Sequence, residues 1–414
     1  MDRMEKANDI RFNSLLVAIF ICVSSISWVV DRLLPIHSGI IFIVIALSMT
    51  AMLIRHSIKG RTVASFFGNY VNVYQLVLLI IVIFFFVVTF FGKKSNYTFD
   101  YLQCFILYGF TAYILSKREY NMLLIMRYIM YIGILPICLI ILTNEYNDTS
   151  REDYYGYLMG LSYGFLPIFI SALFSLFNDK KIHAKLLALF IIVSLFSFYT
   201  AKASRGALAA VLAYVILYLF FHKKITRLRI FIFILLAVIT VIGLANTAVL
   251  AKILQYIVDK LKINSFAINK TIELMIKNDI SNGRLEIWAN AIKDIHFLYG
   301  NGIGVFEQFN DGYVHNIVLQ LAYEFGILNL LLFIGTMGIV ILKKRKFFYD
   351  NRDFLIYLIC IAIVELMFSS SFWLSNKFWF LLCFVTTADK KESKIYLNNK
   401  GINIKSDSLR RNII

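Results

Sequence analysis

The chain contains few of the residues that mark soluble proteins or interrupt helices. Of its 414 residues, 16% are charged and three are proline (Pro35, Pro136 and Pro167), whereas 60% are apolar. Soluble domains are about half apolar and about a quarter charged, so this composition excludes a soluble protein. No internal repeat and no low-complexity linker is present. The sequence therefore predicts an all-α, polytopic membrane protein.

The sequence also has few cysteines and lacks the motifs of metal-binding sites. The cysteines lie in apolar runs and follow no spacing typical of a metal site or a disulfide framework. The polar segments contain no HExxH motif and no acidic metal cluster, so we expect a mechanism without a metal or other cofactor. The glycines between Gly300 and Gly304 follow a predicted helix instead of joining a strand to one, which excludes a nucleotide-binding loop. The five cysteines are Cys22, Cys104, Cys138, Cys360 and Cys383.

Long apolar runs dominate the sequence. At roughly 20 residues per span, they predict about twelve transmembrane helices. The chain then divides into nine such helices within 1–250, a large polar loop with short helices at 251–316, three more within 317–388, and a basic tail at 389–414. The predicted spans lie near residues 12–30, 35–54, 70–91, 100–116, 121–142, 157–177, 185–200, 206–221, 229–250, 317–342, 354–370 and 373–388.

The net charge of +17 is distributed in a pattern that predicts topology. Every second loop is rich in lysine and arginine, and such loops face the cytoplasm. We therefore predict that both termini are cytoplasmic and that the loop at 251–316 lies on the opposite, periplasmic face. Because the positive charge is explained in this way, no nucleic-acid partner is expected.

Three polar residues meet on that outer face in the predicted topology. Arg205 begins the eighth span, Arg284 begins a helix in the long loop, and His315 lies where the loop re-enters the membrane. Guanidinium groups bind anions, and histidine exchanges protons near neutral pH. Taken singly, they also fit a snorkelling arginine, a surface-helix arginine and a structural histidine. Their convergence favours catalytic residues.

The helix beginning at Arg284 is predicted to be amphipathic. Ser281 or Asn282 would cap its N-terminus, and Gly283 would allow the entry turn. Its apolar face would lie against the bilayer surface or the helical bundle. That face consists of Leu285, Trp288, Ile292 and Ile295.

Six residues near these three are candidates for substrate binding. Among them, Glu365 and Lys377 flank the short outer turn between the last two spans, where they could pair with each other or face a cavity. The two glycines among them belong to a sharp turn that would bring the loop back toward the bundle. The six are Asn316, Trp288, Gly302, Gly304, Lys377 and Glu365.

Four motifs follow one another in the order SRGALAA, GRLEIW, NGIGVF and HNIVLQLAYEFGILNLLLF. Together they resemble the membrane domain shared by bacterial O-antigen ligases and Wzy-type polysaccharide polymerases. The resemblance covers about residues 200–340 by motif and the rest by span layout. It implies a GT-C-like fold and functional roles for Arg205, Arg284 and His315.

The resemblance also implies a reaction and its partners. The enzyme would lie in the bacterial inner membrane and transfer a glycan from undecaprenyl diphosphate by metal-independent, inverting chemistry on the periplasmic face. The arginines would bind the pyrophosphate, and the histidine would accept the proton of the attacking sugar hydroxyl. Membrane lipid and a chain-length regulator are further implied partners.

Two positions favour a polymerase over a ligase. The histidine motif of ligases has glycine, threonine or tyrosine where this chain has Asn329, and their arginine motif has leucine where it has Ala209. The tail SSSFWLSNKFWFLL also resembles polymerases. A polymerase would use another lipid-linked repeat unit as acceptor, whereas an O-antigen ligase, the alternative, would use lipid A core.

Two functions outside enzymes are less well supported. A lipid-linked oligosaccharide flippase or other transporter would be expected to carry charges along a central path, with broken spans in matching halves. Here the candidate groups gather on one face beside a long loop. A membrane-bound assembly partner would leave that gathering unexplained.

Overall fold

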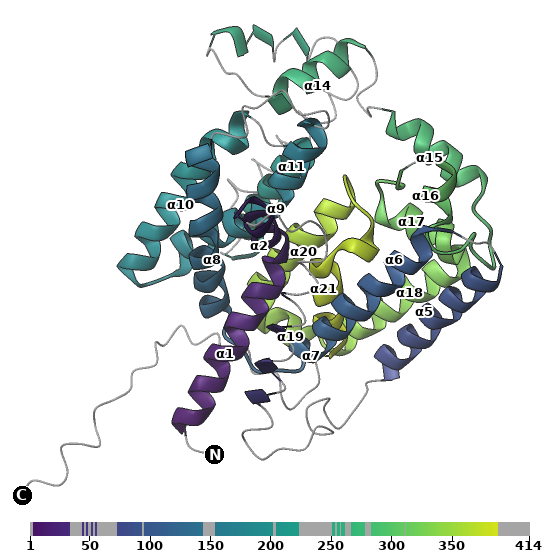
Figure 1. Cartoon of the computed structure of the whole chain (residues 1–414), viewed down its shortest axis with the longest axis horizontal. Coiled ribbons are helices and arrows are strands. Elements are labelled where there is room, and N and C mark those ends of the chain that lie inside the picture. Colours follow the sequence, from purple (N-terminus) through teal and green to yellow (C-terminus); the bar gives the residue numbers. More distant parts are fainter. Residues whose placement is uncertain are drawn as a thin grey trace, which may run out of the picture.

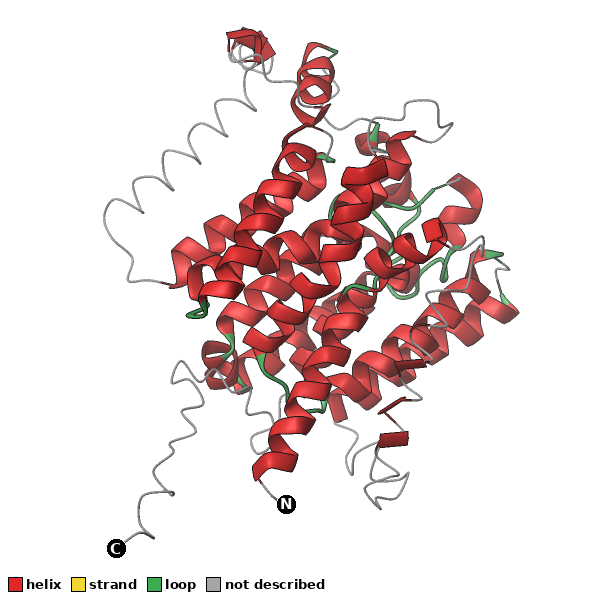
Figure 2. Ribbon diagram, turned by 60° about the vertical axis from the view of Figure 1, so that its left-hand side comes forward, coloured by secondary structure: helices red, strands yellow, loops and turns green. Residues whose placement is uncertain are grey.

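The computed structural model describes most of the chain as helix. The described residues are 3–33, 44, 47–48, 51–52, 54–55, 73–92, 95–143, 154–201, 204–222, 251–252, 255–256, 258–260, 266–277, 283–310 and 312–387. Within them every regular element is helical and no strand occurs (Figure 2). The predicted all-α class is confirmed for these residues. The predicted span at 229–250, most of that at 35–54 and the basic tail at 389–414 lie outside them.

The helices follow the apolar runs closely in the first half of the chain. Here the structure contains α1 (Arg3–Ile21), α2 (Val23–Leu33), α5 (Val73–Phe91), α6 (Tyr97–Cys104), a π-helix η1 (Phe105–Gly109), α7 (Phe110–Ser116), α8 (Met122–Thr143), α9 (Tyr154–Asn178), α10 (Ile182–Ala201) and α11 (Arg205–His222).

The second half contains shorter helices. They are α14 (Phe266–Ile276), α15 (Arg284–Lys293), α16 (Val305–Asn310), α17 (Ile317–Phe325), α18 (Ile327–Lys343), α19 (Arg345–Asp350), α20 (Arg352–Leu366), a 3-10 helix η3 (Phe372–Leu374) and α21 (Asn376–Thr387).

Several of these helices could cross a membrane. Among the described residues, three are long and apolar enough: Val73–Phe91, Met122–Thr143 and Gly156–Asn178. The pair Glu5–Ile21 and Val23–Leu33, bent by 69°, would make a fourth if it forms one broken span. A multi-pass membrane protein is thus supported, but the predicted number of about twelve spans is not reached by these criteria in the described part of the chain.

One predicted span, 317–342, is broken into two helices. The break falls at Gly326, whose φ of 88° is in the region that favours glycine. A Cβ there would lie 2.9 Å from the backbone carbon of Tyr299, so the returning loop passes directly against the break. The amides of Ile327 and Leu328 donate to the carbonyls of His296 and Phe297, at 3.2 and 2.9 Å. The loop backbone therefore replaces the hydrogen bonds that a continuous helix would make.

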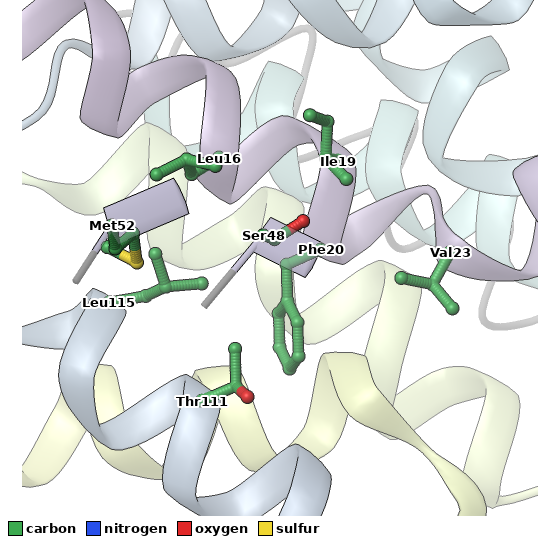
Figure 3. A pocket seen from close by; sticks show the side chains of 8 residues that line it. All are labelled: Leu16, Ile19, Phe20, Val23, Ser48, Met52, Thr111 and Leu115. Carbon is green, nitrogen blue, oxygen red and sulfur yellow. The ribbon is translucent and has the colours of Figure 1, made fainter. Parts of the chain in front are cut away.

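The bundle core is formed by helices distant in sequence (Figure 1). Helix α9 packs against α8 and α10, α11 against α20, α21 against α7, and α1 against α8. Helices α14 and α15 lie at the end of the bundle opposite the chain's N-terminus, and α15 packs on α17. The core is tightly filled: the void between α1 and α7 shown in Figure 3 has a volume of about 10 Å³, room for about one water molecule.

A buried ion pair joins α8 to the end of α9. Arg127 donates from Nε and an Nη to the two carboxylate oxygens of Asp179, each at 2.6 Å. The carboxylate is fully buried and the guanidinium nearly so. The pairing explains an arginine two turns inside a predicted span, because two parallel hydrogen bonds stabilise both charges.

Replacing Arg127 with methionine should therefore lower stability strongly. The change leaves Asp179 buried without its counter-charge, which costs about 3–5 kcal/mol. The thermal midpoint of the purified protein in detergent measures the loss. The double variant Arg127→Met with Asp179→Asn should recover part of it. Equal midpoints for the wild type and Arg127→Met would contradict the pairing.

Candidate functional site

Phe368, just after α20, is the common neighbour of Arg284, His315 and the chain segment that contains Arg205. The Arg284 guanidinium carbon lies 5.9 Å from the centre of its ring. Its backbone makes a hydrogen bond with the imidazole of His315. A Cβ on Gly206, the residue after Arg205, would lie 2.8 Å from the Phe368 Cβ. The structure thus brings together three chain segments that are far apart in sequence.

The start of α11 is packed closely because its residues are small. A Cβ on Gly206 would lie 1.9 Å from the hydroxyl oxygen of Tyr163 on α9, so no side chain fits there. The same hydroxyl makes a hydrogen bond with Ser204 and lies within electrostatic range of Arg284. Tyr163 is therefore a central group of this site. Sequence reasoning missed it, because no motif distinguishes Tyr163 from the other 23 tyrosines of the chain.

Helix α15 presents Arg284 at its first residue. The N-cap is Gly283, with φ 77° and no side-chain capping bond. The predicted turn at Gly283 is therefore present, whereas the prediction of Ser281 or Asn282 as the N-cap is wrong. Ser281 and Asn282 lie outside the described residues. Burial lowers the pKa of Arg284, while the guanidinium keeps its charge at neutral pH.

The predicted apolar face of α15 is divided between packed residues, Trp288 and Ile295, and exposed ones. Leu285 and Ile292 are 64% and 56% exposed. The face that packs is rotated, because α15 docks on the returning loop and on α17 and buries the side nearest them. The residues of that face are Ile287, Trp288, Ala291 and Ile295.

His315 is held in an unusual backbone conformation. Its φ of 56° is left-handed, a conformation that costs free energy in a non-glycine residue and is concentrated at functional sites. The ring of Tyr313 lies 4.3 Å from the imidazole, centre to centre. The indole of Trp288 donates to the carbonyl of Val314 at 3.0 Å and so fixes the backbone just before His315. Trp288 thus positions the histidine.

One imidazole nitrogen of His315, Nδ1, is buried and has no hydrogen-bond partner among the described residues. A hydrogen bond with the Phe368 backbone raises the pKa of the imidazole. Burial and the nearby Arg284 guanidinium outweigh it and lower the pKa to about 4. At neutral pH the ring is uncharged, with Nδ1 available to accept a proton.

Asn316 has a clear structural task. Its side-chain oxygen accepts hydrogen bonds from the amides of Val318 and Leu319, at 3.0 and 3.2 Å, and so caps α17. The cap fixes the position at which the chain leaves His315 and enters the helix.

Gly302 and Gly304 form the predicted sharp turn, with φ values of 103° and 73°. A Cβ on Gly302 would lie 2.9 Å from the hydroxyl of Thr89, and one on Gly304 equally close to Tyr97. The turn therefore packs against the end of α5 and the start of α6. A substrate-binding role for these glycines stays a prediction.

Glu365 and Lys377 pair with each other. Their carboxylate and ammonium form a buried ion pair between α20 and α21. Lys377 also donates to the carbonyl of Tyr163 at 3.4 Å. Of the two arrangements left open by the sequence, the structure has the ion pair, and it supports the backbone of the tyrosine at the site.

A second buried polar network attaches the loop to the bundle. The amide of Gln320 donates to Glu324 at 3.0 Å and to Glu307 at 3.4 Å, and Trp373 donates to Glu324 at 2.7 Å. Tyr101 donates to Glu307 at 3.0 Å. Burial raises the pKa of Glu307 and so favours its neutral form. Sequence reasoning missed this network, although a carboxylate inside an apolar run such as AYEFG is itself a signal.

The comparisons with known proteins agree with the resemblance of the motifs. The family described as O-antigen ligase (Wzy_C) matches residues 187–334, which include Arg205, Arg284 and His315. The predicted resemblance to the O-antigen ligase and Wzy superfamily is thereby confirmed over this segment. No curated protein and no solved structure matches the chain. In the described residues, no group of three or more His, Cys, Asp or Glu side chains could hold a metal ion.

Replacing Arg284 with glutamine should raise the pKa of His315. A neighbouring positive charge disfavours the imidazolium, so its removal moves the pKa up from about 4. Burial remains, so the pKa should stay below its ordinary value of about 6.5. NMR titration of ¹³C-labelled histidine measures the shift, with His315→Gln used for assignment.

Lys293→Gln is the matched control, since it removes one positive charge from the other end of α15. It should leave the His315 titration in place. A His315 pKa that is the same in Arg284→Gln and wild type would show that the guanidinium does not act on the imidazole.

Proposed function

We propose that this protein, which matches the O-antigen ligase family over residues 187–334, is a polysaccharide polymerase of the bacterial inner membrane. It joins repeat units carried on undecaprenyl diphosphate. The loop at 251–316 lies on the periplasmic face, and both termini are cytoplasmic. The observation that carries the proposal is the meeting of the Arg205 segment, Arg284 and His315 around Phe368.

The proposed transfer uses each of the three residues. The hydroxyl oxygen of the acceptor sugar attacks the anomeric carbon of the donor and forms the new glycosidic bond. The bond from that carbon to the phosphate oxygen breaks, and undecaprenyl diphosphate leaves with the electron pair. Arg205 and Arg284 stabilise the charge on the leaving group, and His315 Nδ1 takes the hydroxyl proton. Attack opposite the leaving group inverts the configuration.

The low pKa of His315 fits this mechanism when the substrate's charge is included. In the free protein the Arg284 charge lowers the pKa to about 4, so the imidazole is a weak base. A pyrophosphate bound to Arg284 would offset that charge and raise the pKa of His315. The base would then gain strength when the donor is in place.

A polymerase is favoured over a ligase by Ala209 and Asn329, which depart from the ligase motifs. Asn329 is engaged in the fold: its amide donates to the carbonyl of Phe325 at 2.8 Å, across the break at Gly326. An O-antigen ligase that transfers the glycan to lipid A core remains the second candidate, because the matching family carries that description.

His315→Ala should abolish transfer. The purified protein is supplied with lipid-linked repeat units, and product length is read on a gel. We expect a loss of at least roughly 100-fold, the usual contribution of a general base. His296→Ala is the control, since His296 is exposed on the same loop. Wild-type turnover by His315→Ala would remove the histidine from the chemistry.

Cells lacking the gene distinguish the two candidate functions. Surface core bearing one repeat unit, with the ladder lost, indicates a polymerase. Bare core with long lipid-linked polymer indicates a ligase.

The pH profile of transfer should reflect the unusual His315. Because protonation of Nδ1 removes the base, kcat/KM should stay level from about pH 8 to about pH 5 and fall only near the free pKa of about 4. The acid limb of kcat should lie at higher pH, because the bound pyrophosphate offsets Arg284. In Arg284→Gln, the limb of kcat/KM should move upward. An acid limb of kcat/KM near 6.5 in the wild type would contradict this assignment.

A further inference from the structure

An open groove lies between α2 and the first half of α9. Its volume is about 280 Å³. One wall is α2 and the other is the first half of α9. Its lining residues are Ser24, Ser25, Ser27, Trp28, Asp31, Tyr157, Gly160, Leu161, Gly164 and Phe165.

The aromatic side chains of the groove are fixed by their neighbours. The indole nitrogen of Trp28 donates to the hydroxyl of Tyr157 at 3.2 Å. The Trp28 ring also packs edge-on against Phe165, with the ring centres 6.0 Å apart. A ring held on two sides offers a rigid apolar surface at little entropic cost.

The polar groups of the groove suit a neutral, hydroxyl-rich ligand. The exposed side chains of Ser24 and Asp31 lie in the same cavity as the indole of Trp28. Hydroxyl and carboxylate groups pair with sugar hydroxyls, and an aromatic face covers the apolar C–H face of a sugar ring. None of the ten lining residues is lysine or arginine, and the nearby guanidinium carbon of Arg32 lies 5.8 Å from the centre of the Tyr157 ring.

The groove and the candidate site share one end of α9. Gly160 and Gly164 line the groove, and Tyr163 lies between them in sequence with its hydroxyl at the start of α11. Ser25 on α2 donates to the carbonyl of Gly164 at 2.6 Å, which holds the two walls together. On the other side, Ser369, next to Phe368, contacts the sulfur of Met159 at 3.4 Å.

We propose that this groove binds a sugar of the lipid-linked glycan, held on the Trp28 face while the reacting end lies at His315. The inference rests on the proposed function and adds to it a place for the carbohydrate, separate from the arginines that bind the pyrophosphate. Trp28 supplies the stacking surface, and Ser24 and Asp31 supply hydrogen bonds.

Gly160 allows a test that fills the groove with little disturbance of the fold. A Cβ at Gly160 meets no atom within 4 Å, and Gly160 lines the groove, so the side chain of Gly160→Leu should extend into it. Gly335 on α18 is the matched control, since a Cβ there also meets nothing within 4 Å. The probe is an oligosaccharide of two repeat units, released by mild acid from the host's surface polysaccharide and free of lipid.

Equilibrium dialysis of the labelled oligosaccharide against the purified full-length protein measures Kd. We expect Gly160→Leu to raise Kd at least tenfold, and Gly335→Leu to leave it within twofold of wild type. If Gly160→Leu does not purify as a folded protein, the double variant Ser24→Ala, Asp31→Ala should raise Kd similarly, because both side chains are exposed. Equal Kd values for wild type and a folded groove variant would overturn the proposal.

The transfer assay separates this proposal from the function on which it rests. Weaker oligosaccharide binding by Gly160→Leu, with no transfer by wild type, would keep the groove and reject the polymerase. Transfer by wild type, with unchanged binding and unchanged product length in Gly160→Leu, would keep the polymerase and reject the groove.

Discussion

Charged groups inside an apolar helical bundle must be paired or hydrogen-bonded, and the architecture of this protein depends on that constraint. Arg127 with Asp179 joins α8 to α9, and Glu365 with Lys377 joins α20 to α21. Each pair holds two helices at the level where their charges meet. In a low-dielectric interior, neither partner is tolerated alone, so these pairs define which helices are neighbours.

The candidate site uses the opposite arrangement. His315 Nδ1 is buried without a partner among the described residues, and Arg284 lies over an aromatic ring instead of beside a carboxylate. A buried polar atom without a partner costs free energy, and such an atom is a candidate to bind a ligand. The unpartnered Nδ1 and the left-handed backbone of His315 both cost free energy. The rigid surroundings offset this cost through the Asn316 cap and the Trp288 bond to Val314.

The sequence predicted the parts of this structure that depend on local patterns. Uninterrupted apolar runs predicted α5, α8, α9 and α10 to within three residues at each end. The predicted topology put Arg205, Arg284 and His315 on one face, and the structure brings their chain segments together around Phe368. Sequence reasoning failed where a segment distant in sequence determines the local structure. The break at Gly326 depends on the backbone of Tyr299, and the buried side of α15 depends on α17. Tyr163 and Phe368 were missed because their importance comes from what packs against them.

The returning loop has a further consequence for how the protein works over time. Four backbone hydrogen bonds join it to α17 and α18, from Asn301, Gly302, Ile327 and Leu328. Moving this segment would break these bonds, so it belongs with the more stable parts of the fold and not with those that open easily. In the proposed polymerase, the glycan would then move past a loop that stays in place. Successive sugars would meet the same geometry at every step.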